Sequence, residues 1–294
     1  MDMLRIAVPN KGTLSAPAAQ MLRDAGYRQR TDPKDLVCRD PDNNVEFFYL
    51  RPRDIATYVG SGDLDLGVTG RDLLVDSGVP ARELLDLDFG GATFHWAARP
   101  GAVDTVADIK GRRIATAFAG VVRRYLDEHG ISAEVVQLDG AVENAVRLGV
   151  ADLIADVVET GTTLRQAGLV TVGEPLMRSS AILIGRTPLE DDPASTTESV
   201  GKAAGAAQLL RRLQGVLVAR RYVMLVYDVR ADLLEQATGL TPGIESPTVS
   251  PLHREGWVAV QSMVPRRDVH RIMDELYDLG ARAILVTDIG NCRL

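Results

Sequence analysis

Hydrophobic residues along the first half of the chain fall in short runs, separated by stretches with helical spacing. Runs at Leu4–Val8, Asp32–Arg39, Val45–Leu50 and Leu64–Val68 predict strands, and the spacing after the first and third runs predicts helices. A regular alternation of strands and helices is typical of α/β folds with largely parallel sheets.

Two parts of this pattern occur twice. Gly62–Val68 and Gly149–Ala155 share a Gly, a following Asp and an apolar strand, and both come after a helical stretch. Arg5–Val8 is matched in the same way by Arg113–Thr116. Two matches in the same order indicate two similar α/β lobes.

The repeat predicts where a ligand would bind. Loops at the carboxyl ends of parallel strands form ligand sites, so the cleft between two such lobes is the natural place. We expect one lobe from residues 1–91 and 172–205, and the other from residues 93–170. The apolar runs Phe94–Arg99 and Ala181–Arg186 are expected to be the two crossover strands of a hinge.

The pattern changes after these lobes. Residues 187–201 are rich in Pro, Ser, Thr and acids, which predicts a linker or loop, and Ala203–Leu217 is strongly helical. Residues 216–294 then predict the order β-α-β-β-α-β, which is the ferredoxin-like plan. The expected elements are, in order, Tyr222–Val229, Ala231–Thr238, Ser246–Val249, Val258–Val264, Asp268–Leu279 and Ala283–Ile289.

The turn after the strand that ends at Val158 has an unusual composition. Glu159–Thr163 reads Glu-Thr-Gly-Thr-Thr, which offers backbone N–H groups and hydroxyls to an anion. Asp156 and Glu159 would repel a phosphate unless they bind a sugar hydroxyl or a divalent cation. Together these features suggest a site for phosphoribosyl diphosphate (PRPP). The alternative is an ordinary strand-to-helix turn with Thr160 as N-cap.

Basic residues follow two other predicted strands. Lys11 lies at the carboxyl end of the first strand, beside Gly12, and could bind a phosphate or be a solvated loop lysine. Arg51 and Arg53 come directly after Val45–Leu50. They form either a phosphate clamp or the exposed start of the next helix, and the sequence leaves both readings open.

The stretch from Glu143 to Leu164 resembles the signature of ATP phosphoribosyltransferase, the family that opens histidine biosynthesis. Arg5–Leu14 and Pro242–Thr248 are also similar to that family, and the chain length suits its long, feedback-regulated form. The matching positions of the signature are Glu143, Gly149, Ala151, Ile154, Asp156, Val157, Thr160, Gly161, Thr163 and Leu164.

The resemblance implies a fold and a reaction. The fold is a two-lobed core like type II periplasmic binding proteins, followed by a ferredoxin-like regulatory domain. The reaction is a glycosyl transfer that joins ATP to PRPP and releases diphosphate, with Mg²⁺ held mainly by substrate phosphates. PRPP would be bound by Glu143, Asp156, Glu159, Thr160, Gly161, Thr162 and Thr163, with Asp156 and Glu159 as further candidates for Mg²⁺. Lys11, supported by Arg51 or Arg53, would face the diphosphate, and Gly70, Arg71 and Asp72 would bind ATP.

The resemblance also implies an allosteric site for L-histidine in the last domain. Its expected residues are Asp228, Ile244, Thr248 and Ala283. A capped helix and an exposed turn would explain the same residues without a ligand. One departure stands out, because the family commonly has Tyr-Pro-Asn-Leu where this chain has Phe118–Val121.

Bulk properties narrow the class of protein. The formal net charge is −7 and no basic stripe stands out, which argues against a nucleic-acid partner. The two cysteines and four histidines show no spacing typical of disulfides or zinc sites. No membrane span or signal peptide is predicted, so we expect a cytoplasmic protein. Family members form dimers and hexamers, which implies a homo-oligomer.

Two other functions fit the same cleft. A non-catalytic solute receptor could use a two-lobed fold, and an enzyme that joins PRPP to another purine would share the same loop. The acids beside the Thr-Gly-Thr-Thr turn favour PRPP over an amino acid or a simple oxyanion as the ligand.

Overall fold

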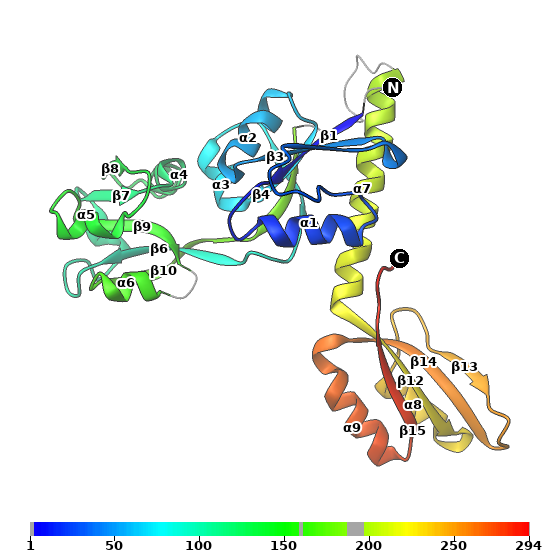
Figure 1. Ribbon diagram of the computed structural model, residues 1–294. Helices are drawn as coiled ribbons and strands as arrows, with labels where there is room; N and C mark the ends of the chain where they lie inside the picture. The colour runs from blue at the N-terminus through cyan, green and yellow to red at the C-terminus, as the bar shows by residue number, and fades with distance from the viewer. Residues whose placement is uncertain (1–2, 159–160, 187–196, 294) are drawn as a thin grey trace. The chain divides into compact units, whose positions relative to one another are not determined.

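The computed structural model describes residues 3–158, 161–186 and 197–293 (Figure 1). It divides into two units, one of Met1–Leu22 with Tyr27–Ala207 and one of Arg23–Gly26 with Gln208–Leu294. The first unit contains two sheets, each with its own helices, and the second contains a third sheet.

The first lobe is built on a six-stranded sheet of order β2-β3-β1-β4-β11-β5. Strand β1 is parallel to β3 and β4, whereas β11 is antiparallel to β4 and β5. The strands are β1 (Leu4–Pro9), β2 (Val37–Asp40), β3 (Val45–Leu50), β4 (Leu66–Gly70), β5 (Arg82–Asp86) and β11 (Ala181–Gly185). The strand expected over Asp32–Arg39 is therefore shorter, because the chain turns through its first residues.

Three α-helices belong to this lobe: α1 (Ser15–Asp24), α2 (Pro52–Ser61) and α3 (Arg71–Ser77). Pro52 suits the first turn of α2, which needs no N–H donor there, and Gly62 ends the helix with a φ of 87°. The helix packs tightly on β4, because a Cβ at Gly67 would lie 2.5 Å from Ile55 Cγ2.

The second lobe has a five-stranded sheet of order β10-β6-β9-β7-β8. Its strands are β6 (Ala92–Ala98), β7 (Arg113–Thr116), β8 (Glu134–Gln137), β9 (Leu153–Val158) and β10 (Val170–Ser179), with helices α4 (Ala119–His129), α5 (Glu143–Arg147) and α6 (Thr162–Gln166). Residues 172–179, which we expected in the first lobe, lie here because β10 pairs with β6.

The links between the lobes are short. Strand β6 lies within the second sheet and β11 within the first, so neither is itself a crossover as the sequence suggested. The chain instead passes between the lobes through residues 87–91 and returns at Ser180. Apolar runs at these places predicted strands correctly but could not tell which sheet each one completes.

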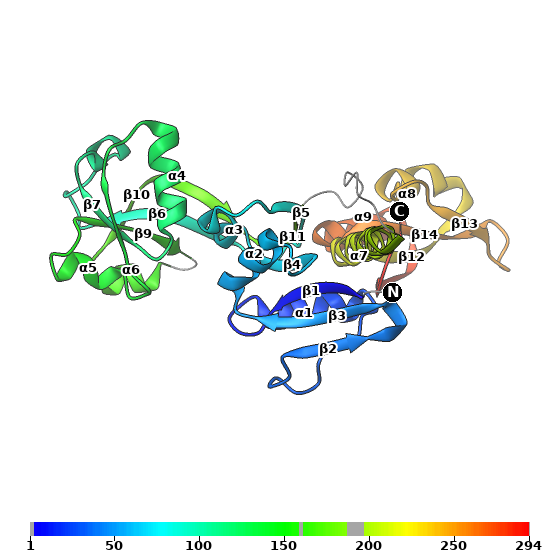
Figure 2. The same cartoon turned by 90° about the horizontal axis from the view of Figure 1, so that it is seen from above.

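The two sheets follow one plan, which confirms the predicted repeat (Figures 1 and 2). Strands β3, β1, β4, β11 and β5 of the first sheet correspond in order to β8, β7, β9, β6 and β10 of the second. The lobes also share a hydrogen bond between a backbone N–H and an aspartate. The N–H of Arg5 donates to Asp65 Oδ2 at 2.8 Å, and the N–H of Arg113 donates to Asp152 Oδ2 at 2.9 Å. This is the two-lobed architecture of type II periplasmic binding proteins.

The second unit has the expected ferredoxin-like plan. Helix α7 (Thr197–Arg221) leads into an antiparallel sheet of order β13-β14-β12-β15. Its elements are β12 (Tyr222–Arg230), α8 (Leu234–Leu240), β13 (Thr248–Pro251), β14 (Trp257–Pro265), α9 (Val269–Leu279) and β15 (Arg282–Asp288). Apolar residues of α8 and α9 pack with those of β12 and β14 in one core, so both helices cover the same face of the sheet.

The helix before this domain starts earlier than expected. Residues 197–201, which we placed in a linker, already belong to α7, while residues 187–196 of that linker lie outside the described residues. Short 3₁₀ helices complete the fold: η1 (Pro41–Asn43), η2 (Val106–Ile109), η3 (Ala231–Leu233) and η4 (Arg266–Asp268). In the described ranges no helix is both long and apolar enough to cross a membrane.

Candidate active site

The second lobe contains a small acidic cavity of about 270 Å³. Its lining includes Glu143 at the start of α5, Asp156 of β9, and Gly161 and Thr163 beside α6. The structure therefore brings together four residues of the predicted PRPP site. Glu159 and Thr160 lie outside the described residues. Thr162 does not line the cavity, and its hydroxyl accepts a hydrogen bond from Arg165 Nη2 at 3.2 Å.

Asp156 is held in an environment that disfavours its charge. Burial raises the pKa of its carboxyl above the ordinary value, and the negative charges of Glu143 and Asp72 raise it further. A hydrogen bond of 2.8 Å from the N–H of Val157 to Asp156 Oδ1 acts in the opposite direction. A ligand with hydroxyl donors or a positive charge would stabilise the ionised form of this carboxyl.

A pair of side chains on β6 supports the end of β9. His95 stands opposite Asp156 in the strand ladder, and its Nε2 lies 3.0 Å from Thr93 Oγ1. The Thr93 hydroxyl in turn donates to the carbonyl oxygen of Val158 at 3.1 Å. Neither residue was singled out from sequence for the site, because only strand pairing places them there.

A second cavity, of about 200 Å³, is formed by residues of both lobes. Lys11, Gly70 and Asp72 come from the first lobe, and Phe118 and Val157 from the second. Val157 also lines the acidic cavity, so the two cavities adjoin at this residue. The remaining lining residues are Gly12, Thr13, Leu14, Pro52, Leu73, Gly90, Ala92 and Ser179.

The turn that carries Asp72 is fixed by two contacts. The Ser179 hydroxyl donates to Asp72 Oδ1 at 2.8 Å and accepts from the N–H of Asp72 at 3.1 Å. A Cβ at Gly70 would lie 2.2 Å from Asp72 Oδ1, so only glycine allows this side-chain position. Asp72 also lies in the first turn of α3, where a negative charge is favourable, and it can contact a ligand from the same position.

The basic residues predicted for the site differ in what their side chains contact. Within the described residues, the side chains of Lys11 and Arg51 form no hydrogen bond or ion pair. Lys11 lines the cavity, whereas Arg51 is exposed and does not line it. Arg71 instead donates to Glu83 Oε1 at 2.7 Å and to Asp86 Oδ2 at 2.8 Å. Its guanidinium therefore fixes α3 to β5, and it does not line the cavity.

Arg53 connects the two lobes. Its Nη1 donates to Asp76 Oδ2 at 2.8 Å and to the carbonyl oxygen of Ala117 at 3.0 Å. Its guanidinium carbon also lies 5.0 Å from the centre of the Phe118 ring. A phosphate clamp was one reading of Arg53 from sequence, but the structure gives its Nη1 two protein acceptors.

The residues predicted for the effector site lie on two strands and a turn of the second unit. Asp228 pairs with Ala259 of β14, and Thr248 of β13 pairs with Gln261 of the same strand, two positions further along. Ala283 has a φ of 49°, and the pairing of β12 with β15 shifts register just before Asp228. Ile244 is exposed in the turn before β13. A strained residue beside a bulge often marks a functional site.

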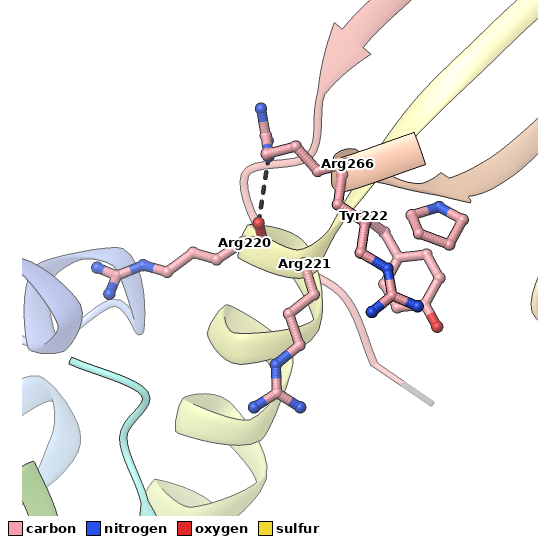
Figure 3. Close-up of a pocket in the computed structure, with 6 residues that line it drawn as sticks. Arg220, Arg221, Tyr222 and Arg266 are labelled. Atoms are coloured by element: carbon pink, nitrogen blue, oxygen red, sulfur yellow. Dashed lines mark hydrogen bonds between the residues drawn. The ribbon is translucent and has the colours of Figure 1, made fainter. Parts of the chain in front are cut away.

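The second unit also holds a larger cavity, of about 590 Å³, at the junction of α7 and the sheet (Figure 3). Its lining residues are Arg220, Arg221, Tyr222, Pro265, Arg266 and Arg267. Figure 3 shows the side chains of Arg220, Arg221 and Arg266 pointing in different directions. Arg266 donates to Asp288 Oδ1 at 2.8 Å and to the carbonyl of Arg220 at 3.2 Å, so these cations do not converge on one anion.

The donors in the acidic cavity suit one kind of metal ion. Among the described residues, no three His, Cys, Asp or Glu side chains form a metal-binding group. Magnesium commonly binds through one or two carboxylates plus substrate phosphates. Glu143 and Asp156 provide that number of carboxylates in one cavity, so the residues present fit an ion that arrives with a phosphorylated substrate.

Comparison with known proteins gives consistent matches along the chain. The family described as ATP phosphoribosyltransferase matches residues 51–215, and the C-terminal domain of the same family matches residues 219–291. The ATP phosphoribosyltransferase of Salinispora tropica is 70% identical over 99% of this chain and 100% of its own length. That of Streptomyces coelicolor is 61% identical over the same shares.

A solved structure agrees with these matches. It is described as the ATP phosphoribosyl transferase (HisG:HisZ) complex from Thermotoga maritima, and it is 25% identical to this chain with a TM-score of 0.58. The alignment covers 72% of this chain and 96% of that one.

Proposed function

Because the chain belongs to the ATP phosphoribosyltransferase family of histidine biosynthesis, we propose that its two adjoining cavities bind PRPP and ATP. The reaction joins ring nitrogen 1 of adenine to the anomeric carbon of PRPP and releases diphosphate. One observation supports this most directly: an acidic cavity with a threonine-rich loop adjoins a cavity that contains Lys11 and Asp72.

The second lobe is proposed to hold PRPP. Backbone N–H groups and hydroxyls of Thr160–Thr163 would bind the 5-phosphate at the start of α6. Asp156 and Glu159 would accept hydrogen bonds from the ribose hydroxyls, and Glu143 would support them from α5. The raised pKa of Asp156 fits this role, since hydroxyl donors of a ligand relieve the cost of its buried charge.

The first lobe is proposed to act on the leaving group and the nucleotide. Lys11, with Arg51, would stabilise the charge that develops on the departing diphosphate. Mg²⁺, bound through substrate phosphates with Asp156 or Glu159 as further ligands, would neutralise part of the same charge. Of the three residues assigned to ATP, Gly70 and Asp72 line the cavity, while Arg71 would act by fixing α3.

The test is diphosphate release by the purified chain. ATP, PRPP and magnesium together should give release, and omission of any one should abolish it. Release with another purine in place of ATP would identify a different phosphoribosyltransferase. Binding of PRPP without release under any of these conditions would favour a non-catalytic receptor.

We also propose that residues 216–294 form a regulatory domain that binds L-histidine. Asp228 would pair with the ligand's ammonium or imidazole group, Thr248 would bind its carboxylate, and Ile244 and Ala283 would form walls. Calorimetry should show affinity lower by about 10- to 100-fold in Asp228→Ala, the effect of removing a charged hydrogen-bond partner. Asp274→Ala, an exposed acid on α9, is the control. Equal affinity for Asp228→Ala and the wild type would remove Asp228 from the site.

Assembly and location are further parts of the proposal. The Thermotoga relative is an assembly of two kinds of chain, whereas this chain carries a C-terminal domain of its own. We propose a homo-oligomer, a dimer that forms hexamers, and a cytoplasmic location where ATP and PRPP are available. Light scattering with and without histidine measures the assembly directly.

A further inference from the structure

Three residues form a compact contact between the lobes, which we name the interlobe clamp (Arg53, Asp76 and Gly120). Arg53 of α2 donates from one nitrogen to Asp76 of the same lobe and to the Ala117 carbonyl of the other. The second oxygen of Asp76 accepts from the N–H of Gly120 at 2.8 Å. Only 13% of the Asp76 side chain is exposed, so both of its bonds are largely shielded from water.

Glycine is required at position 120 by the closeness of the two lobes. A Cβ there would lie 2.2 Å from the carbonyl oxygen of Asp76 and 3.0 Å from its Cα, and both are backbone atoms that cannot turn aside. This gives a physical reason for one residue of Phe118–Val121, the segment in which the chain departs from the family pattern. A larger residue at 120 would have to separate α3 from α4.

Asp76 also completes the start of α4. The N-cap residue of this helix is Phe118, which has no side chain able to accept from the first N–H groups. Asp76 supplies that acceptor from the other lobe, and its negative charge is favourable at a helix N-terminus. The position of α4 is thereby coupled to the position of the first lobe.

The clamp adjoins the cavity that contains Lys11 and Asp72. Phe118, which precedes α4, lines this cavity and packs edge-to-face on Phe94 with ring centres 5.4 Å apart. The Arg53 guanidinium lies against the same ring. We propose that Arg53, Asp76 and Gly120 are positioning residues that hold Phe118 and the start of α4 as a wall of the substrate cavity. This inference rests on the proposed function of that cavity.

The test compares variants of the full-length chain in the diphosphate-release assay. Gly120→Ala should lower kcat/KM by about 10- to 100-fold, mainly through KM, because a displaced wall weakens the orientation of the substrate. Separation of α3 from α4 would also weaken the packing of Val75 on the core of the second lobe, so the melting temperature of Gly120→Ala is measured beside kcat/KM. Gly201→Ala is the matched control, because a Cβ there meets nothing within 4 Å.

A double-mutant cycle tests whether the residues act as one unit. Arg53→Met and Asp76→Asn should each lower kcat/KM, and the double variant should lose no more than the worse single one. Arg53→Lys should restore part of the loss. Arg53 is half exposed, so these variants decide the question even if Gly120→Ala fails to fold.

The possible results separate the two proposals. No diphosphate release by the wild type would contradict the proposed function. Release by the wild type together with wild-type kcat/KM in Gly120→Ala would contradict the clamp alone. Losses in Arg53→Met and Asp76→Asn that simply multiply in the double variant would also contradict it.

Discussion

The two lobes of the first unit share one scaffold but present different chemistry at their strand ends. In both, an arginine N–H at the start of the central strand bonds to an aspartate before the next parallel strand. After β1 and β4 the first lobe presents Lys11 and Asp72, whereas after β9 the second presents an acid-flanked threonine loop. A repeated fold can therefore carry two different halves of one site, because the loops vary while the sheet order does not.

The lobes also differ in how firmly their loops are fixed. The Gly70–Asp72 turn is tied to β5 by the ion pairs of Arg71 and to β10 by Ser179. Among the described residues of the second lobe, Asp156 accepts one hydrogen bond, from the N–H of Val157, and its surroundings disfavour its charge. The turn that carries Asp72 is thus fixed by contacts within the protein, whereas the charge of Asp156 is disfavoured by its surroundings.

The largest effect is expected from the first lobe. Lys11→Ala should reduce kcat by about 100- to 1,000-fold, the usual cost of losing one group that stabilises developing charge. Lys11 is exposed, so the melting temperature should not change. Lys34→Ala, at another exposed loop lysine, is the control for the loss of one positive charge. Near-normal turnover by Lys11→Ala would mean that the leaving group is stabilised elsewhere.

A smaller effect on activity is expected from the second lobe, together with a gain in stability. Asp156→Asn should lower kcat/KM by about 10- to 100-fold, as expected for lost hydrogen bonds to a charged acceptor. It should also raise the melting temperature of the unliganded protein near neutral pH, because the wild type there holds a buried charge.

The pH dependence of stability provides a second check on Asp156. A folded pKa above the ordinary 3.8 means that the folded state holds the proton more tightly than the unfolded state does. The stability from this group is therefore greatest at low pH and is lost as the pH rises through the raised pKa. The difference in melting temperature between Asp156→Asn and the wild type should grow over the same range. A constant difference would show that the carboxyl is not perturbed.

The smallest effects should be equal in the two lobes. Asp65→Ala and Asp152→Ala each remove the acceptor of one backbone N–H and one partner of an ion pair, with Lys202 and with Arg113, which together cost about 1–3 kcal/mol of the free energy of unfolding. Asp→Asn at either position keeps an oxygen acceptor and should cost less. Denaturant unfolding measures both pairs. A large effect in only one lobe would show that the shared contact is not equivalent.

Local pattern was enough to predict the two lobes and the last domain, but not the strands β5, β8 and β10. The repeat, the α/β alternation and the order of the last domain follow from apolar spacing and from Gly and Asp at matching positions. The assignment of residues 172–179 to the first lobe was wrong, because the pairing of β10 with β6 depends on the partner strand and not on the run itself. A strand near a lobe boundary has the same composition whichever sheet it joins.

The site was predictable where its residues are close in sequence. The cavity of Glu143, Asp156 and Thr163 lies within one supersecondary unit, so one motif contained it. Contacts between residues that are distant in sequence could not be predicted. Examples are the hydrogen bonds of Ser179 with Asp72 and of Arg53 with the carbonyl of Ala117. An arginine after a strand looks the same in sequence whether it binds a phosphate or a carboxylate of its own protein.

The late position of β11 has a consequence for how the chain is made. Ala181–Gly185 is fully buried between β4 and β5, yet it follows the whole second lobe in sequence. During synthesis, the first sheet cannot form completely until β11 has left the ribosome, and until then the edge of β4 has no partner strand. The second lobe is one continuous segment and can fold before that. The edge of β4 that β11 covers is therefore protected only after the second lobe has been synthesised.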